Sequence, residues 1–347
     1  MMATSANPYV GPRPFQRKEK LYGRDWEVNE LRDLLLTHRV VLLHSPSGAG
    51  KTSLLNANLL PLIEREGFAA TPPLRVNTPP PTGVSPVPNR YLASLVAQIE
   101  PGMSAGQLAE RSLRDALQAF FAERPAGTLG NLLVLDQFEE ILTIDPTDYA
   151  AKQVLFSTLG ALVRDPSWML LFAMREDYIG AIEPFARPLP GRLSARFRLD
   201  LLSERSALDA IQLPACDASV IFDLDAARLL VEDLRQVRVQ QPDGAWQFQT
   251  GLYIEPMQLQ LVCRRLWEQP RPDPTRISAD DVRKLGNIDD TLGAYYSEEV
   301  RRIAADEGVP ERFLRDWVER ELITIQGLRG QVLKGAATTA GLTNSVI

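Results

Sequence analysis

The sequence predicts an α/β fold built on a doubly wound parallel sheet, followed by a helical domain and a winged-helix domain. Three short apolar runs have the character of buried strands: VVLLH at 40–44, NLLVLD at 131–136 and WMLLFAM at 168–174. Helical patterns lie between them, and strands that alternate with helices form parallel sheets. From about residue 200 helical patterns dominate, and two helices followed by a glycine-turned hairpin come last.

The expected domains are residues 1–199 for the α/β domain, 200–275 for a helical lid domain and 276–347 for the winged-helix domain. The proline-rich segment at 269–276 is the predicted linker before the last domain. Residues 71–90 carry many prolines as well. Because proline fixes φ and lacks an amide donor, we expect mainly extended loop there.

Apolar residues at helical spacing predict the helices of each domain in turn. The first follows Asp25, whose side chain suits a helix cap. The predicted helices span about 26–36, 51–60, 105–123, 148–164, 203–212, 223–238, 256–268, 277–285, 289–306 and 311–322, and the final hairpin spans 323–333.

Composition and charge limit the classes of function. The 347 residues are 45% hydrophobic and 24% charged with a net charge of -6, which is typical of a globular protein and disfavours nucleic acid as a general partner. The two cysteines, Cys216 and Cys263, are too few for a disulfide framework or a zinc cluster. This favours the reducing cytoplasm as the compartment of the protein. The first residues lack a signal-peptide pattern, and no apolar run approaches the ~20 residues of a spanning helix. We therefore expect a cytoplasmic protein without a membrane partner.

The stretch HSPSGAGKTS, which follows the first predicted strand, fits the phosphate-binding pattern GxxxxGK(S/T) except that Ser45 replaces the first glycine. Such a loop aims backbone amides at phosphates, its lysine reaches the terminal phosphates and its hydroxyl binds Mg²⁺. Serine adopts most of the required backbone conformations unless φ is positive. We expect ATP or ADP with Mg²⁺ to bind here, to Ser45, Pro46, Ser47, Gly48, Ala49, Gly50, Lys51, Thr52 and Ser53.

Acidic residues at the end of the second strand predict the rest of the site. Asp136 follows four apolar residues, where a carboxylate would hold Mg²⁺ through water, with Thr52 as the other metal group. Glu139 and Glu140 lie close enough to polarise an attacking water as a general base. Glu139 is slightly favoured because it is nearer to the aspartate, and both remain candidates.

Arginines near two further strands are candidate phosphate sensors. Arg175 ends the third strand, where it would reach the γ-phosphate, although a surface role is equally common for such a residue. Arg196, in a cluster with Arg192 and Arg198, is a candidate for reaching the nucleotide of a neighbouring subunit. A solvated basic face is the favoured interpretation of that cluster.

With these motifs in this order, the chain resembles the NTPase module of the STAND class, signal-transduction ATPases within the AAA+ and NACHT-like lineage, and in particular its bacterial novel-STAND type. The opening NPYVGPRPFQRKEKLYGRDWEVNEL resembles an N-terminal motif whose GR(D/E)xE turn lies over the nucleotide base, here Gly23, Arg24, Asp25 and Glu27. YIEPMQLQLVCRRLWE resembles a helical-domain motif whose proline, Pro256, lies near the adenine. The resemblance thus implies nucleotide contacts by Arg24 and Pro256.

The last 28 residues resemble the start of a winged helix. The resemblance implies that family members continue to a histidine that touches the β-phosphate in the resting state, whereas His38 and His44 come too early to be that residue. We therefore expect this sequence to end within its winged-helix domain.

The expected function is an ATP-binding, slowly hydrolysing molecular switch whose nucleotide state controls conformation and self-association. The resemblance implies a role in bacterial signalling or phage defence, with a trigger and an effector protein that the sequence does not identify. Two alternatives remain: a DNA-acting AAA+ ATPase of the initiator or loader type, and a nucleotide-free scaffold whose loop has decayed at Ser45.

Overall fold

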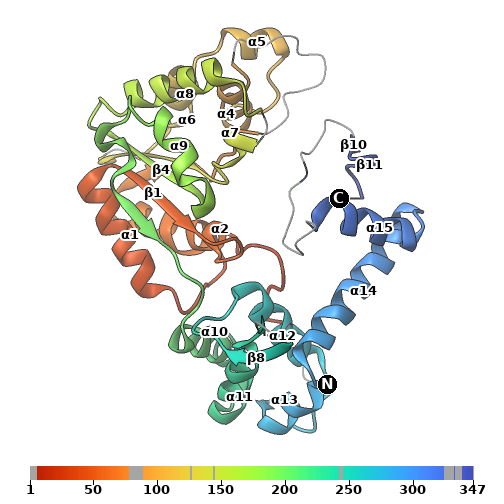
Figure 1. Cartoon of the computed structure of the whole chain (residues 1–347). Helices are drawn as coiled ribbons and strands as arrows, with labels where there is room; N and C mark the ends of the chain where they lie inside the picture. Colours follow the sequence, from red (N-terminus) through yellow and green to blue (C-terminus); the bar gives the residue numbers. More distant parts are fainter. Residues whose placement is uncertain are drawn as a thin grey trace.

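The structure, a computed structural model, describes residues 6–77, 89–125, 127–143, 145–241, 245–323, 332 and 338–346. These residues form three parts, and the long helix α14 (Ile288–Glu307) leads from the second part to the third (Figure 1). Within the described ranges, no helix combines the length and apolar character needed to cross a membrane. The hairpin predicted at 323–333 falls almost wholly outside these residues.

The first part contains a five-stranded parallel sheet, which confirms the predicted α/β fold. The spatial order of its strands is β2-β3-β4-β1-β5, so β4 lies between the two strands that carry the predicted phosphate-binding loop and aspartate. The strands are β1 (Val40–Ser45), β2 (Phe68–Ala70), β3 (Gly130–Leu135), β4 (Trp168–Arg175) and β5 (Arg196–Arg198).

Both faces of this sheet are covered by helices, as its continuous apolar strands require. Successive strand residues alternate between two cores: Leu42 and Phe172 belong to one, Leu43 and Leu171 to the other. The helices of this part are α1 (Asp25–His38), α2 (Lys51–Ser53), η1 (Leu54–Leu59), α3 (Leu60–Arg65), α4 (Arg90–Ile99), α5 (Ala105–Glu110), α6 (Leu113–Phe120), α7 (Glu140–Thr143), α8 (Tyr149–Leu162), η2 (Glu176–Tyr178), α9 (Ile179–Ile182), η3 (Glu183–Phe185) and η4 (Pro190–Leu193).

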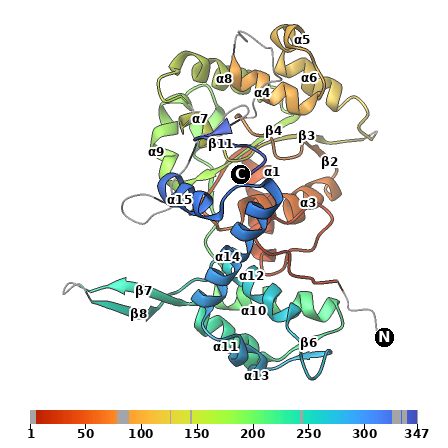
Figure 2. The same cartoon turned by 90° about the vertical axis from the view of Figure 1, so that its right-hand side faces the viewer.

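The second part is mainly helical and has a core of its own, built from residues such as Ile211, Leu230 and Val262. A two-stranded hairpin projects from its side (Figure 2). The elements are α10 (Glu204–Asp217), β6 (Ile221–Phe222), α11 (Leu224–Leu234), β7 (Gln236–Gln240), β8 (Trp246–Thr250), α12 (Pro256–Glu268), β9 (Arg276–Ile277) and α13 (Ala279–Leu285).

The third part consists of α14, α15 (Glu311–Leu322), β10 (Thr338–Thr339) and β11 (Leu342–Thr343). Its small core includes Leu314, Trp317 and Leu342, and the Trp317 indole donates a hydrogen bond to the Ala340 carbonyl at 3.0 Å. The two short strands pair antiparallel.

The structure differs from two predicted helices. The helix predicted at 105–123 is divided because the Ser112 side chain accepts a hydrogen bond from the Asp115 amide and starts α6 anew. The helix predicted at 223–238 ends at Leu234, and the chain then enters the hairpin. The segments QVRVQ and WQFQT alternate polar and apolar residues with the period of two that is typical of strands.

Candidate functional site

A cavity of about 450 Å³ lies at the carboxyl ends of β1, β3 and β4, the edge at which open parallel sheets bind ligands. Its wall includes the predicted phosphate-binding loop, residues that follow β3 and end β4, an N-terminal segment and the start of α12. The lining residues predicted from the sequence are Arg24, Ser47, Gly48, Ala49, Gly50, Lys51, Thr52, Ser53, Asp136, Glu139, Arg175 and Pro256. Ser45, Pro46, Glu140 and Arg196 do not line it.

The loop between β1 and α2 has the geometry of a phosphate cradle. Gly48 and Gly50 have φ values of 81° and 93°, a left-handed conformation that favours glycine. Ser45 is outside that region, so its backbone needs no glycine. Gly50 directly precedes α2, whose residues line the cavity, and the first amides of a helix, which have no partner within it, are groups that bind anions.

Lys51 and Thr52 line the cavity, and both polar groups are hydrogen-bonded within the site. The Lys51 ammonium donates to the Ser45 hydroxyl at 2.7 Å, and the Thr52 hydroxyl donates to the Asp136 carboxylate at 2.7 Å. Burial lowers the pKa of Lys51, while the nearby charges of Glu139 and Asp136 act in the opposite direction. The arrangement places one cation where terminal phosphates would bind.

Thr52 and Asp136 form a donor set that fits Mg²⁺. In the part of the chain that the structure describes, no three His, Cys, Asp or Glu side chains gather into a metal-binding group. Magnesium, unlike zinc, is commonly bound by one or two protein oxygens together with phosphates and water. The hydroxyl and the carboxylate, already in contact, would suit a magnesium ion that arrives with phosphate and water.

The two glutamates after β3 differ in orientation. Glu139 is buried, lines the cavity and accepts a hydrogen bond from the Arg175 amide at 3.2 Å, and burial raises its pKa. Glu140 starts α7 and does not reach the cavity. Its Oε2 atom is buried without a hydrogen-bond partner among the described residues, and burial raises its pKa to about 7. The geometry thus favours Glu139 as the candidate base.

The buried carboxyl of Glu140 gives a testable pH dependence of stability. Because its pKa is higher in the folded protein than the ordinary 4.5, the folded state binds the proton more tightly, and the free energy of unfolding falls as the pH rises from 4.5 to about 7. We expect Glu140→Gln to raise the melting temperature at pH 8 and to leave it nearly unchanged at pH 4.5. Thermal denaturation at both values measures this, and an equal effect at both would show that the charge is not the cause.

The predicted arginines occupy different surroundings. Arg175 lines the cavity, and its guanidinium donates to Asp177 at 2.6 Å. Arg196 donates to Glu183 at 2.7 Å and to the Leu193 carbonyl at 2.8 Å, away from the cavity. Arg175 is therefore the arginine placed to meet a nucleotide bound in this chain.

Arg24 is buried beneath the phosphate-binding loop. Its guanidinium donates to the Ala49 carbonyl at 3.1 Å, to the Asp200 carbonyl at 2.8 Å and to Glu27 at 2.6 Å, and burial lowers its pKa. These bonds connect the loop with the chain that follows β5. Arg24 thus supports the loop in addition to lining the cavity.

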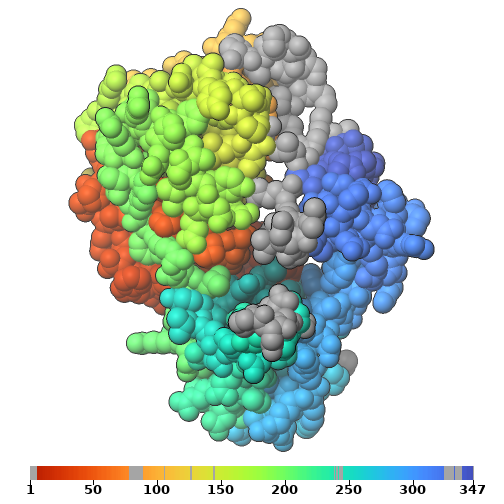
Figure 3. Space-filling view, viewed as in Figure 1, coloured from red at the N-terminus to blue at the C-terminus, as the bar shows by residue number. Residues whose placement is uncertain are grey.

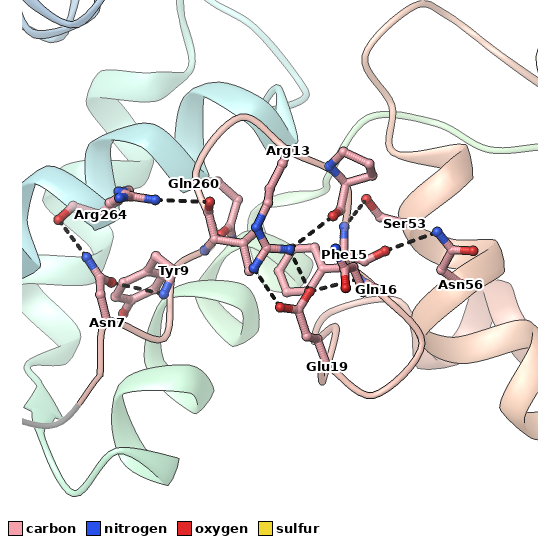
Figure 4. A network of polar contacts seen from close by, with 12 residues as sticks. Asn7, Tyr9, Arg13, Phe15, Gln16, Glu19, Ser53, Asn56, Gln260 and Arg264 are labelled. Carbon is pink, nitrogen blue, oxygen red and sulfur yellow. Dashed lines mark hydrogen bonds and ion pairs between the residues drawn. The ribbon is translucent and has the colours of Figure 1, made fainter. Parts of the chain in front are cut away.

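An N-terminal segment that sequence motifs alone did not place joins the first two parts of the molecule (Figure 4). On one side the Phe15 amide donates to the Ser53 hydroxyl at 3.1 Å. On the other side the Val10 amide donates to the Gln260 side chain at 3.0 Å, and the Tyr9 hydroxyl donates to the Ile211 carbonyl at 2.6 Å. Between these anchors, Gly11–Phe15 line the cavity. The alternating prolines of GPRPF, which favour extended backbone, were the available signal.

The strand order, the glycine-rich loop with its lysine and the hydroxyl–carboxylate pair define a P-loop NTPase. Solved structures agree with this fold. A Walker-type ATPase of Pyrococcus abyssi superposes with a TM-score of 0.50 at 14% identity, covering 96% of this chain and 97% of that one. The ORC2 protein of Aeropyrum pernix, in its ADPNP and ADP complexes, superposes with a TM-score of 0.54 at 15% identity, covering 96% of this chain and 86% of that one.

The family follows from the sequence. The family model described as novel STAND NTPase 1 matches residues 8–329, and the chain belongs to this family of NTPases. The match includes nearly all of the first and second parts and most of the third. None of the curated proteins compared matches the chain.

Proposed function

We propose that the chain is an ATP-binding, slowly hydrolysing switch whose nucleotide state controls its conformation and self-association. The observation that carries the proposal is the composition of the cavity wall. A nucleotide there would touch the loop of the α/β part, the N-terminal segment and Pro256 at the start of α12. A ligand that contacts two separately packed parts favours the arrangement of those parts in which it makes more contacts. It therefore shifts the equilibrium between arrangements by the difference in its affinity for them.

The chemistry assigned to each residue follows from its position. Gly48, Gly50 and the amides after them would bind the phosphates, and Lys51 would bind the terminal ones. Mg²⁺, held by Thr52 and Asp136, would neutralise phosphate charge. Glu139 would orient a water and accept its proton, while Arg175, at the end of the neighbouring strand, would respond to the γ-phosphate.

The position of the third part supports a switch rather than a fixed enclosure. No described residue after Gln260 lines the cavity, and in the space-filling view the third part lies to one side of the α/β part (Figure 3). If this part, which we propose to be the winged-helix domain, covers the nucleotide in the resting state, it must move to do so. We propose domain boundaries at residue 199, as the sequence suggests, and after α13, because Ile277 and Val282 pack in the core of the second part.

Light scattering with bound nucleotide tests the proposal. We expect the purified protein to form larger assemblies with a slowly hydrolysed ATP analogue and Mg²⁺ than with ADP, and Lys51→Ala to show no such difference. An identical mass with both nucleotides, each shown to be bound, would contradict control of self-association.

We further propose a cytoplasmic role in bacterial signalling or phage defence, on the basis of the family.

The magnesium site has its own test. Asp136 accepts the Thr52 hydroxyl and is almost completely buried, so Asp136→Ala should remove one of the two protein groups that hold the ion. We expect it to weaken MgATP binding by about tenfold or more, because a carboxylate that holds the ion through bound water typically contributes 10–100-fold to metal affinity. Binding measured in EDTA should differ little between the variant and the wild type. Equal weakening with and without Mg²⁺ would place the defect in the fold of the loop.

A DNA-acting ATPase of the initiator or loader type is the second candidate, favoured by the fold likeness to the ORC2 protein. The helix that would read DNA in a winged helix, α15, argues against it. Its arginines Arg312, Arg315 and Arg320 each pair with an acid of the same helix. Phosphate binding releases counterions and depends steeply on salt. DNA binding that weakens steeply between low and moderate salt would favour this candidate over the switch.

A further inference from the structure

The residue that departs from the phosphate-binding pattern makes the hydrogen bond that fixes the lysine. Ser45 ends β1 and its side chain is fully buried. Its hydroxyl donates to the Pro46 carbonyl at 2.7 Å and accepts from the Lys51 ammonium at 2.7 Å. A hydroxyl has one proton and two lone pairs, so the bond to Pro46 commits the proton and leaves the oxygen to face the ammonium as an acceptor.

Ser45 belongs to a strand, whereas the residues that follow it form the loop. It lies in a central strand of the sheet, in register with Arg175 of β4, and its φ is not in the left-handed region. Glycine in this position would leave the ammonium without this acceptor, while bringing no conformational advantage. Groups on strands position a site more precisely than groups on loops.

The bond to Ser45 also leaves the lysine available to a ligand. Asp136 and Glu139 affect Lys51 through their charges, but among the described residues its ammonium is hydrogen-bonded to Ser45 and not to a carboxylate. No ion pair must therefore break when a phosphate arrives. An ammonium has three donors, and two remain for phosphate oxygens while one stays on Ser45.

We propose that the Ser45 hydroxyl is a positioning group for Lys51. Its hydrogen bond holds the Lys51 ammonium at the phosphate site both before the nucleotide binds and while the nucleotide is bound. The inference rests on the proposed nucleotide-binding function. It concerns the terminal phosphates alone, because Lys51 is the group through which Ser45 acts.

Calorimetric titration of the full chain with MgADP, MgATP and AMP tests the inference. Ser45→Ala and Ser45→Gly both remove the hydroxyl, and Ser94→Ala removes another buried serine hydroxyl, on α4 outside the cavity. We expect both Ser45 variants to bind MgADP and MgATP about tenfold more weakly, a difference of about 1.4 kcal/mol. AMP binding and the Ser94→Ala variant should match the wild type.

A double-mutant cycle separates positioning from a structural effect. In a Lys51→Ala background, Ser45→Ala should cause no further loss of MgADP affinity, because the group that it positions is gone. A loss as large as in the wild-type background would show that Ser45 acts on the loop backbone, and would overturn the inference. Unchanged or tighter binding by both Ser45 variants would also overturn it. A wild-type protein that binds no nucleotide would instead refute the proposed function itself, and this inference with it.

Discussion

Replacing Lys51 with alanine is expected to weaken the binding of MgADP and MgATP by about 100-fold or more. Lys51 lines the cavity, and its partial burial reduces the screening by water of its attraction for phosphate. Hydrogen bonds that involve charged groups contribute about 1.5–3 kcal/mol each, so the loss of two phosphate contacts accounts for an effect of this size. Calorimetry on the wild type and the variant measures it directly.

A matched control comes from another lysine. Lys20 is exposed and pairs with Asp217, outside the cavity, so Lys20→Ala removes the same functional group without touching the site. We expect this variant to bind nucleotide as the wild type does. If Lys51→Ala binds as tightly as the wild type, the nucleotide site lies elsewhere and the assignment of the loop is wrong.

The predictability of the sheet depended on how each strand is buried. The three central strands are continuous apolar runs because both of their faces are covered, and each was located to within a residue or two. The edge strands β2 and β5 were missed. They are three residues long, Phe-Ala-Ala and Arg-Phe-Arg, and are only partly buried, so neither carries a hydrophobic pattern of its own. Pairing with a neighbouring strand defines them.

The candidate site was predictable where its residues are close in sequence and not where the fold brings distant segments together. Lys51 and Thr52 follow from the loop pattern. The contact of Thr52 with Asp136 joins residues 84 positions apart, and the cavity wall formed by Gly11–Phe15 depends on the packing of that segment against α12. Spacing alone also left Glu139 and Glu140 open, because the direction of each side chain depends on the turn before α7.

That turn gives the basis for separating the two glutamates. Gln137 has a φ of 50°, and its conformation redirects the chain after Asp136. The Glu139 carboxylate then meets the Arg175 amide at the end of β4, while Glu140 enters α7. Glu139 therefore lines the cavity and Glu140 does not, although the two are neighbours in sequence.

Glu139→Gln is expected to retain nucleotide affinity and to lower ATP turnover by about 100-fold or more, the usual contribution of a general base. Glutamine has nearly the same shape and accepts the Arg175 amide, but it cannot accept a proton from water. The loss therefore appears in the transition state and not in ground-state binding. Steady-state phosphate release together with calorimetry separates the two quantities.

Glu140→Gln is the matched control, because it makes the same chemical change one residue further along, outside the cavity. We expect its turnover to equal that of the wild type, and reversed results would exchange the two assignments.

The pH profile of turnover adds an independent test of the base. Since burial raises the pKa of Glu139, wild-type turnover should fall on acidification at a higher pH than an exposed glutamate would give, as the carboxylate takes up its proton. The low residual turnover of Glu139→Gln should lack this fall, because the group that titrates has been removed, whereas a fall at the same pH in both proteins would assign the titration to another group.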